Sequence, residues 1–284
     1  MDLHIREANT ADAGIFGEIC YHAFKNIADQ HNYPPDFPSP EVAAGMYSNL
    51  LPHPKFHAAA AELNGSVVGS IVVSERSKMA GISVLTVNPD IQNKTVGRSL
   101  MQYSLDRLED RFDGVQLIQA AYHVRSLCLY AKLGFEAREM LSTMQGPAID
   151  LQLPGYEVRS ATIDDLGACN QVCVNVHGHD RSAEVQDAIQ QGSAQVVEHQ
   201  GKITGYTTAM AFFGHSVGET NEDLKALIGA APEFQGPGIL VPTSNGELFR
   251  WCMENGLRNG MQLTLMSYQD YNKPQGPFMP AILC

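Results

Sequence analysis

The sequence predicts an α/β fold made of two tandem domains, and three observations support this prediction. Its 284 residues are enough for two domains of ordinary size. Strand-like segments alternate with amphipathic helical ones along the first half, which is typical of a mixed sheet flanked by helices. Several residue spacings also occur twice in the same order, which indicates two copies of one fold.

The repeated spacings begin with an arginine that is followed by an aspartate at +6 and a cysteine at +14. These residues are Arg6, Asp12 and Cys20 in the first half and Arg159, Asp165 and Cys173 in the second. Further along, both halves carry a Gly-turn hairpin and then a helix closed by a glycine, Gly134 or Gly256. We therefore expect one domain at residues 1–152 and a degenerate copy of it at 153–284.

The first copy divides into elements by its apolar periodicity and its turn residues. We expect strands at 3–7, 57–62, 66–75, 79–87, 115–121, 135–142 and 147–152, and helices at 11–27, 41–51, 96–112 and 124–133. This order indicates a mixed, mostly antiparallel sheet flanked by helices. A Pro-rich loop at 33–40 separates the first two helices.

The composition limits the class of protein and its partners. No apolar run approaches 18 residues, so we expect no transmembrane helix, and the N-terminus lacks the features of a secretory signal. The net charge of −12 argues against nucleic acid as a partner and is compatible with a cationic substrate. Six scattered cysteines are typical of reduced thiols in a cytoplasmic protein. We expect a cytoplasmic protein that acts on a small molecule, and a homodimer stays an open alternative to a monomer.

The stretch from Val87 to Leu100 carries the strongest functional signal. A strand-like run ends at Val87, a short polar loop follows, and an amphipathic helix begins at Val96. A helix N-terminus presents unpaired N–H groups and a partial positive charge, and both favour a phosphate. Gly97 lets a ligand approach the backbone closely. The pattern predicts a site for the pyrophosphate of a nucleotide-bearing ligand.

Two motifs in the first half resemble those of the GNAT superfamily of acetyl-CoA-dependent N-acetyltransferases. The acetyl-CoA motif, usually Q/R-x-x-G-x-G/A after a strand ending in V-x-P, corresponds to Gln-Asn-Lys-Thr-Val-Gly at 92–97. The second motif, N-x-x-S/A-x-x-L-Y-x-K-L-G-F, corresponds to His-Val-Arg-Ser-Leu-Cys-Leu-Tyr-Ala-Lys-Leu-Gly-Phe at 123–135. Thr95 replaces the first glycine of one motif, and His123 replaces the asparagine of the other.

The resemblance implies a coenzyme gap where the fourth and fifth strands of the sheet splay, with acetyl-CoA as cosubstrate; we expect no metal. The fourth strand would pair with the pantetheine arm, and the loop and helix start would hold the pyrophosphate. The implied coenzyme-binding residues are Leu85, Val87, Gln92, Asn93, Lys94, Thr95, Val96, Gly97, Arg98, Ser99, His123 and Ser126. Tyr130 would be the general acid that protonates the departing CoA thiolate.

A general base is harder to identify, because the strand at 81–87 carries no carboxylate. Glu75, His57 and His31 are the candidates, although each is better explained as a surface or packing residue. The Pro-rich loop offers side chains that either form a wall of the acceptor pocket or belong to a rigid, solvated loop. These are His31, Tyr33, Asp36 and Phe37.

The second copy lacks the chemistry of the first. Its expected phosphate loop leads into a helix near Thr220 with Glu222 and Asp223 in the first turn, and carboxylates there repel an anion. Cys252 stands at the position of Tyr130, four residues before the closing glycine. We therefore expect one active site per chain and a non-catalytic second domain that shapes the substrate site.

The run from His177 to Asp180 has the composition of a metal cluster, but no third spaced ligand set accompanies it. The function that the sequence favours is transfer of an acetyl group from acetyl-CoA to a primary amine of a small molecule by direct attack. The alternative is a non-catalytic acyl-CoA-binding sensor or a pseudoenzyme, which Thr95 and the degenerate second copy would fit. An acyltransferase that uses a longer acyl group is a third reading of the same site.

Overall fold

The computed structural model describes residues 2–92 and 95–284. The elements of the first half are β1 (Leu3–Glu7), α1 (Ala13–His31), α2 (Pro40–Leu50), β2 (Phe56–Leu63), β3 (Ser66–Ser74), β4 (Met79–Val87), α3 (Val96–Leu108), β5 (Gly114–Ala120), α4 (Val124–Lys132) and β6 (Glu136–Gln145). Those of the second half are β7 (Tyr156–Ser160), α5 (Leu166–His177), α6 (Ser182–Gln191), β8 (Gln195–His199), β9 (Lys202–Thr207), β10 (Ser216–Gly218), α7 (Asn221–Gly229), β11 (Ile239–Pro242), α8 (Gly246–Glu254), β12 (Arg258–Gln269) and β13 (Phe278–Met279).

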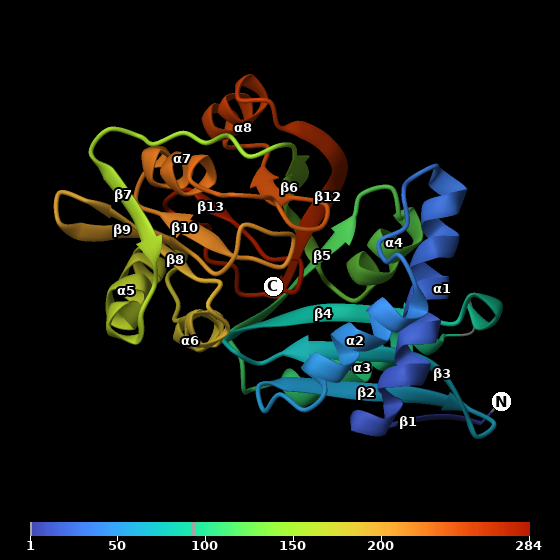
Figure 1. Cartoon of the computed structure of the whole chain (residues 1–284). Coiled ribbons are helices and arrows are strands. Elements are labelled where there is room, and N and C mark those ends of the chain that lie inside the picture. The colour runs from blue at the N-terminus through green and yellow to red at the C-terminus, as the bar shows by residue number, and fades with distance from the viewer. Residues whose placement is uncertain (1, 93–94) are drawn as a thin grey trace.

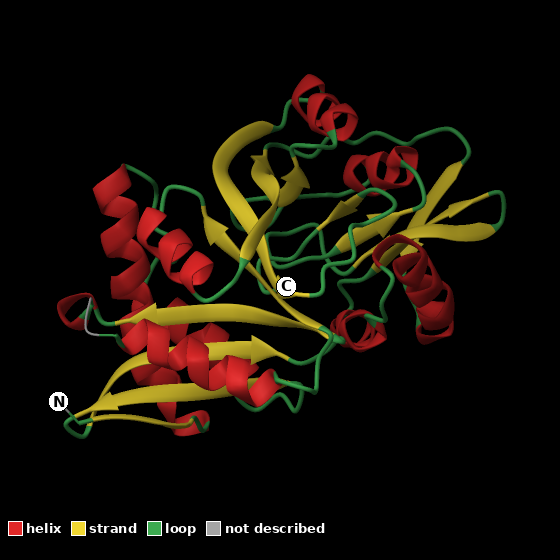
Figure 2. Cartoon of the chain, turned by 180° about the vertical axis from the view of Figure 1, so that it is seen from behind, coloured by secondary structure: helices red, strands yellow, loops and turns green. Residues whose placement is uncertain are grey.

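The order of helices and strands is the same in both halves up to β12, so the predicted tandem α/β fold is confirmed. The two halves form two lobes, and the C-terminus lies between them in both views (Figures 1 and 2). A polar cluster is also repeated, because one arginine in each half ties the first strand to the start of the first helix and to the second strand. The partners are Asp12 and Glu62 for Arg6, and Asp165 and Glu198 for Arg159.

The two copies exchange strands rather than forming separate sheets. The large sheet has the order β1-β2-β3-β4-β5-β12-β6-β11, and the small sheet has the order β13-β10-β9-β8-β7. Strand β12 of the second copy therefore lies between β5 and β6 of the first copy and is antiparallel to both. Strand β6 in turn lies between β12 and β11 of the second copy. The long β12 strand bridges the lobes in Figure 1.

The strand predicted at 147–152 is wrong, because no strand is assigned there. Pro147 cannot donate to a ladder, and β12 already fills the position beside β5 that a further strand of the first copy would need. The helix predicted at 96–112 is also shorter than expected and ends at Leu108.

The helices of the first copy cover both faces of its sheet, because alternate strand residues point to opposite faces. Ala60, Val72 and Val84 pack with α1 and α2. Ala59 and Ile71 pack with α3 and α4 on the other face. Helix α3 is thereby fixed against the sheet, with its N-terminus beside the end of β4.

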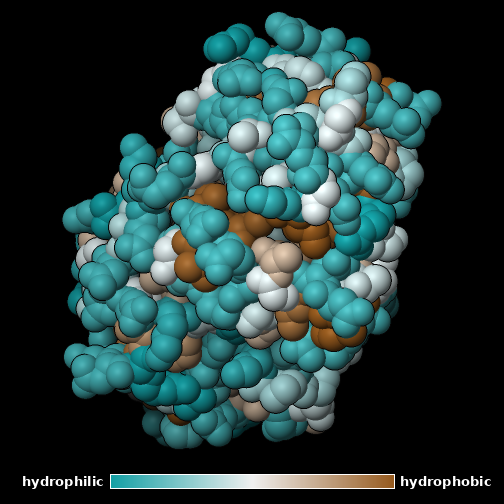
Figure 3. Space-filling view, turned by 90° about the vertical axis from the view of Figure 1, so that its left-hand side faces the viewer, coloured by the Kyte–Doolittle hydropathy of each residue, from teal (hydrophilic) through white to brown (hydrophobic). Residues whose placement is uncertain are grey.

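The surface on the side of the second copy is mostly polar, with apolar patches confined to its middle (Figure 3). In the described part of the chain, no helix has both the length and the apolar character that crossing a membrane requires. All six cysteines are free thiols.

Candidate functional site

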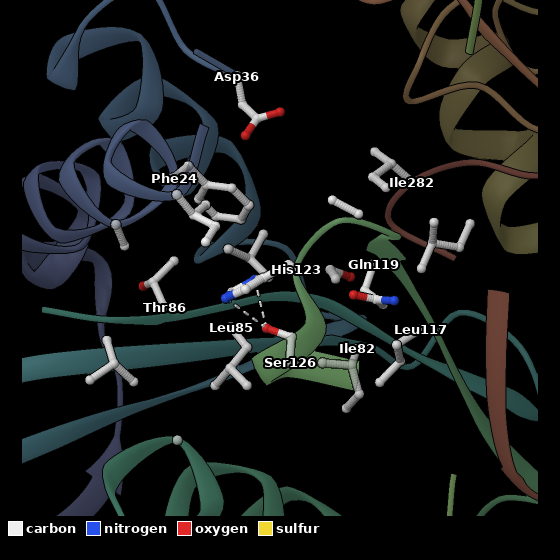
Figure 4. Close-up of a pocket in the computed structure, with 18 of the residues that line it drawn as sticks. Phe24, Asp36, Ile82, Leu85, Thr86, Leu117, Gln119, His123, Ser126 and Ile282 are labelled. Atoms are coloured by element: carbon white, nitrogen blue, oxygen red, sulfur yellow. Dashed lines mark hydrogen bonds between the residues drawn. The ribbon is translucent and has the colours of Figure 1, made fainter. Parts of the chain in front are cut away.

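The candidate site lies where β4 and β5 separate. These strands pair in parallel only from Met79 to Ile82 on β4, and beyond Ile82 they diverge. A pocket of about 520 Å³ occupies this gap. Figure 4 shows the pocket with the end of β4 below it and with Ser126 and His123 beside it.

The edge of β4 that faces the gap presents backbone groups to the pocket. Asn88 donates its N–H to the carbonyl of Val68 on β3, at 2.8 Å. Because backbone groups alternate along a strand, the N–H and C=O groups of Leu85 and Val87 point the other way, into the gap. An extended ligand can therefore pair with β4 as an added strand would.

Most of the residues predicted to bind the coenzyme line this one pocket. They are Leu85, Val87, Gln92, Thr95, Val96, Gly97, Arg98, His123 and Ser126. Ser99 does not line it, because it lies one turn into α3 and its N–H donates to the Thr95 carbonyl at 2.9 Å. Asn93 and Lys94 lie outside the described residues.

The start of α3 has the features of an anion site. The N–H groups of the first turn, from Val96 to Arg98, have no partner within the helix. A methyl group added at Gly97 would lie 3.6 Å from the side chains of Leu129 and Val87, so packing does not require a glycine there. A glycine there leaves the backbone at the helix start accessible to a ligand.

Thr95, which precedes α3, adopts a left-handed conformation with φ of 67°. This conformation explains the glycine that the family motif has at this position. A β-branched residue is strained there, at a cost of about 1–3 kcal/mol. The substitution therefore affects the backbone of the loop itself.

Two further contacts shape the end of the pocket near the start of α3. Gln92 donates from its side-chain amide to the carbonyl of Val87 at 3.3 Å. Arg125 donates to the oxygen of the same amide. Arg98 and Arg125 both line the pocket and are exposed, which gives this end a positive charge suited to phosphates.

Tyr130 lies on α4 and lines the same pocket, with only 7% of its surface exposed. Burial raises the pKa of its phenol to about 12, and the Ser126 hydroxyl acts in the opposite direction. The phenol is therefore protonated at neutral pH and can donate a proton. His123 bonds through Nδ1 to the Ser126 hydroxyl at 2.7 Å. Burial, with Arg125 and His31, lowers the pKa of His123 to about 4, so the ring is neutral at pH 7.

The general-base candidates from the sequence do not line the pocket. Glu75 is paired with Arg111 at 2.9 Å. His57 stacks on Tyr103, and the exposed His31 bonds to the Ile27 carbonyl. Three residues of the Pro-rich loop do line the pocket, namely Asp36, Phe37 and Pro38. Tyr33 supports the wall from behind by stacking on the lining residue Tyr122, at 4.4 Å between ring centroids.

Several lining residues were missed by the sequence analysis. They are Gln119, Tyr122, Arg125, Phe212, Phe213, Met261, Leu263, Ile282 and Leu283. Those numbered above 200 come from the second copy, and only the strand exchange brings them here. The signal for Gln119 was a polar residue in an apolar strand, which alternation alone assigns to either face.

The corresponding gap of the second copy, between β10 and β11, is filled by the chain itself. Strand β13 pairs with β10, with Val217 opposite Phe278, and also packs on β11. The N-terminus of α7 is closed by a capping box in which Asp223 accepts from the N–H of Thr220 at 2.8 Å. Cys252, at the position of Tyr130, is fully buried.

Two histidines of the second copy, one on α5 and one just before β10, form a buried pair. His177 and His215 lie Nε2 to Nε2 at 3.0 Å, and Asp180 is turned away to bond with Asn170 and Ser182. Within residues 2–92 and 95–284, no three histidine, cysteine or acidic side chains are arranged to hold a metal ion.

One family model and two solved structures are similar to this chain. A sequence model of the Acetyltransferase (GNAT) family matches residues 22–135. The fold is similar to a proposed acetyltransferase from Pyrococcus horikoshii (TM-score 0.77, 15% identity, 99% of this chain and 94% of that one). It is also similar to a GCN5-related N-acetyltransferase from Sphaerobacter thermophilus (TM-score 0.62, 16% identity, 96% of each chain).

A curated relative matches over a shorter stretch. The UPF0157 protein YqkA of Bacillus subtilis (strain 168) is 30% identical over 83 residues, which are 29% of this chain. The match spans 24% of the length of that relative.

Proposed function

Residues 22–135 make this chain a member of the acetyltransferase (GNAT) family, and we propose that it moves an acetyl group from acetyl-CoA to the primary amine of a small molecule by direct attack. Family membership supports acyl transfer as the general reaction. The choice of acetyl-CoA and of an amine rests on the pocket. The proposed catalytic domain is residues 1–152, and residues 153–284 complete the substrate site without catalysing.

The observation that carries the proposal is the meeting of three features in one pocket. The open edge of β4 suits an extended arm, and the N-terminus of α3 at Gly97 suits a pyrophosphate. The protonated phenol of Tyr130 lines the same pocket. A strand edge, an anion site and an acid in this arrangement match the parts of an acyl-CoA thioester.

The residues of the pocket divide the work as follows. Leu85 and Val87 hold the arm through their backbone, and the N–H of one of them stabilises the negative charge that develops on the thioester oxygen. Arg98 and the first turn of α3 hold the pyrophosphate. Tyr130 gives its proton to the departing thiolate, a contribution of about 100-fold or more for general acid catalysis.

The proposal is tested at Gly97, the second residue of α3. Gly97→Ala adds a methyl group that the fold accommodates, and alanine favours the helix by about 1 kcal/mol. The same methyl group occupies the approach of the pyrophosphate, so we expect the Kd for acetyl-CoA, measured by calorimetry, to rise about tenfold. Stability and coenzyme affinity should therefore change in opposite directions.

The matched control is Gly167→Ala. Gly167 is also the second residue of its helix, α5, and an added methyl group meets nothing within 4 Å. This variant should bind acetyl-CoA like the unaltered protein. Equal affinity in the Gly97 variant would contradict the coenzyme site. Tight binding of acetyl-CoA with no thiol release on any amine would support a sensor instead.

A further inference from the structure

The pocket has two chemically different halves. The coenzyme half is formed by Gln92, the start of α3 and Arg125, and it is polar and positively charged. The other half, called the acceptor half here, is apolar, and its walls come from both copies. Its side chains are Phe24, Phe37, Met46, Phe212, Phe213 and Ile282.

The second copy holds its part of this wall in a fixed position. Ile282 donates its N–H to the carbonyl of Phe212 at 3.0 Å. Ser83 on β4 donates its hydroxyl to the carbonyl of Leu283 at 3.0 Å. The chain after β13 is thus bonded at once to the second copy and to the edge of the coenzyme gap. Phe213 also lines the pocket and remains 47% exposed.

One carboxylate stands in this apolar wall. Asp36 is the acidic side chain among the described residues that line the pocket, and no residue of that part of the chain gives it a hydrogen bond or an ion pair. Burial raises its pKa to about 6, so it is charged at neutral pH. A half-buried charge without a protein partner requires water or a cationic ligand.

A second polar group lines the same pocket without a partner. Gln119 on β5 is 6% exposed, and neither its amide nitrogen nor its amide oxygen bonds to any described residue. Buried amides are almost always satisfied, so this one indicates a water or a ligand in the pocket. Figure 4 draws both Asp36 and Gln119 among the side chains that surround the cavity.

We propose that the acceptor is a monoamine with an apolar aromatic or branched aliphatic body, whose ammonium group Asp36 binds and whose body the side chains of the second copy enclose. Polyamines and aminoglycosides do not fit, because each further ammonium would need a carboxylate that this wall does not offer. The inference rests on the proposed function and names the substrate class for the same site.

The proton balance of the reaction follows from these assignments. Asp36 takes one proton from the bound ammonium, and the neutral amine forms the new C–N bond as the C–S bond breaks. Tyr130 gives its proton to the sulfur and regains one from the nitrogen as the amide forms. Asp36 then releases its proton to solvent, so one proton is produced for each amide and each free thiol.

The test compares amines by thiol release and by direct binding. The probes are phenethylamine and isoamylamine against spermidine and kanamycin, each with saturating acetyl-CoA. We expect kcat/KM for the two monoamines to exceed that for the polycations by about tenfold or more. Asp36→Asn should lower kcat/KM for phenethylamine about 100-fold and leave the KM for acetyl-CoA unchanged. Phe213→Ser should raise the KM for phenethylamine.

The matched control is Asp29→Asn, which removes an exposed carboxylate on α1 that pairs with Lys25 outside the pocket. It should leave kcat/KM for phenethylamine and the KM for acetyl-CoA unchanged. Preference for spermidine or kanamycin, or an unaffected Asp36→Asn variant, would overturn the inference while the acetyltransferase activity stands. If no amine is acetylated, calorimetry with CoA decides: Asp36-dependent binding of phenethylamine supports the substrate class although the reaction fails, and no binding overturns it.

Discussion

The molecule has two gaps at equivalent positions of its two copies, and one is an open pocket whereas the other is filled by the chain. In the first, β4 leaves an open edge beyond Ile82, and the start of α3 faces a pocket. In the second, β13 pairs with the edge of β10, and Asp223 caps α7. The phenol of Tyr130 in the first gap is replaced by the buried thiol of Cys252.

The comparison teaches how a gap of this kind can be closed without loss of the fold. The second gap has not collapsed. It is occupied by a segment of the same chain that makes strand pairs like those an extended ligand would make. Asp223 likewise accepts the N–H of Thr220 and puts a negative charge at the start of α7, which repels an anion. The second copy therefore keeps its stability by satisfying internally what the first copy offers to a ligand.

The largest expected effect separates Tyr130 from its counterpart. Tyr130→Phe removes the proton donor and should lower kcat about 100-fold or more, with little change in the Kd for acetyl-CoA. Cys252→Ala removes a thiol with no contact to the pocket and should leave kcat unchanged. Steady-state thiol release measures both. Equal rates in the two variants would remove the catalytic distinction between the gaps.

The next largest effect concerns the occupant of the second gap. Phe278→Ala removes a buried ring of β13 and should lower the free energy of unfolding by about 3 kcal/mol. Chemical denaturation measures this loss. Calorimetry should still give one acetyl-CoA per chain, because Asp223 keeps the start of α7 closed. A second coenzyme in this variant would show that β13 alone blocks the gap.

The histidine pair makes the second copy sensitive to acid. Burial, followed by neighbouring positive charges, holds the pKa of His177 and of His215 well below the usual value. The unfolded chain binds more protons than the folded one below about pH 6.5, so stability should fall as the pH falls through that value. The slope should reach about 1.4 kcal/mol per pH unit for each histidine. His215→Gln should flatten it in denaturation measured from pH 7 to pH 5.

The smallest effect compares the residues that precede the two helices. Thr95 is left-handed, whereas Thr220 before α7 is extended, with φ of −136°, and belongs to a capping box. Thr95→Gly should raise the free energy of unfolding by about 1 kcal/mol, because it relieves strain. Thr220→Gly should lower it by a few tenths of a kcal/mol or more, because the cap is lost. Thermal unfolding of both variants measures these two changes in stability, which should have opposite signs.

Local sequence signals predicted the fold because they depend on neighbouring residues. The motif at 123–135 predicted the position of α4 and of Tyr130 on it. The strand ending at Val87 and the helix beginning at Val96 predicted where the gap lies. The strand exchange could not be predicted, because β12 satisfies the same apolar pattern beside any strand. Gly146 and Pro147 were sequence evidence against a strand at 147–152, because both residues disfavour a strand.

The end of the pocket at the start of α3 could be predicted from the sequence, and the acceptor half could not. The first depends on consecutive residues of one loop and one helix. The second assembles Asp36 from an early loop with Phe212 and Ile282 from the other copy. Their proximity depends on tertiary packing, and only the alternative of a pocket wall for the Pro-rich loop anticipated part of it.

The exchanged strands make each copy depend on the other for a complete sheet. A chain cut at residue 152 would lose β12, so β5 and β6 would each expose an unpaired edge on which other chains could add. Loss of the second half would thus destabilise the sheet of the first half, because β6 would lose both of its neighbours. The second copy is therefore needed for the strands that it contributes, whatever its own gap contains.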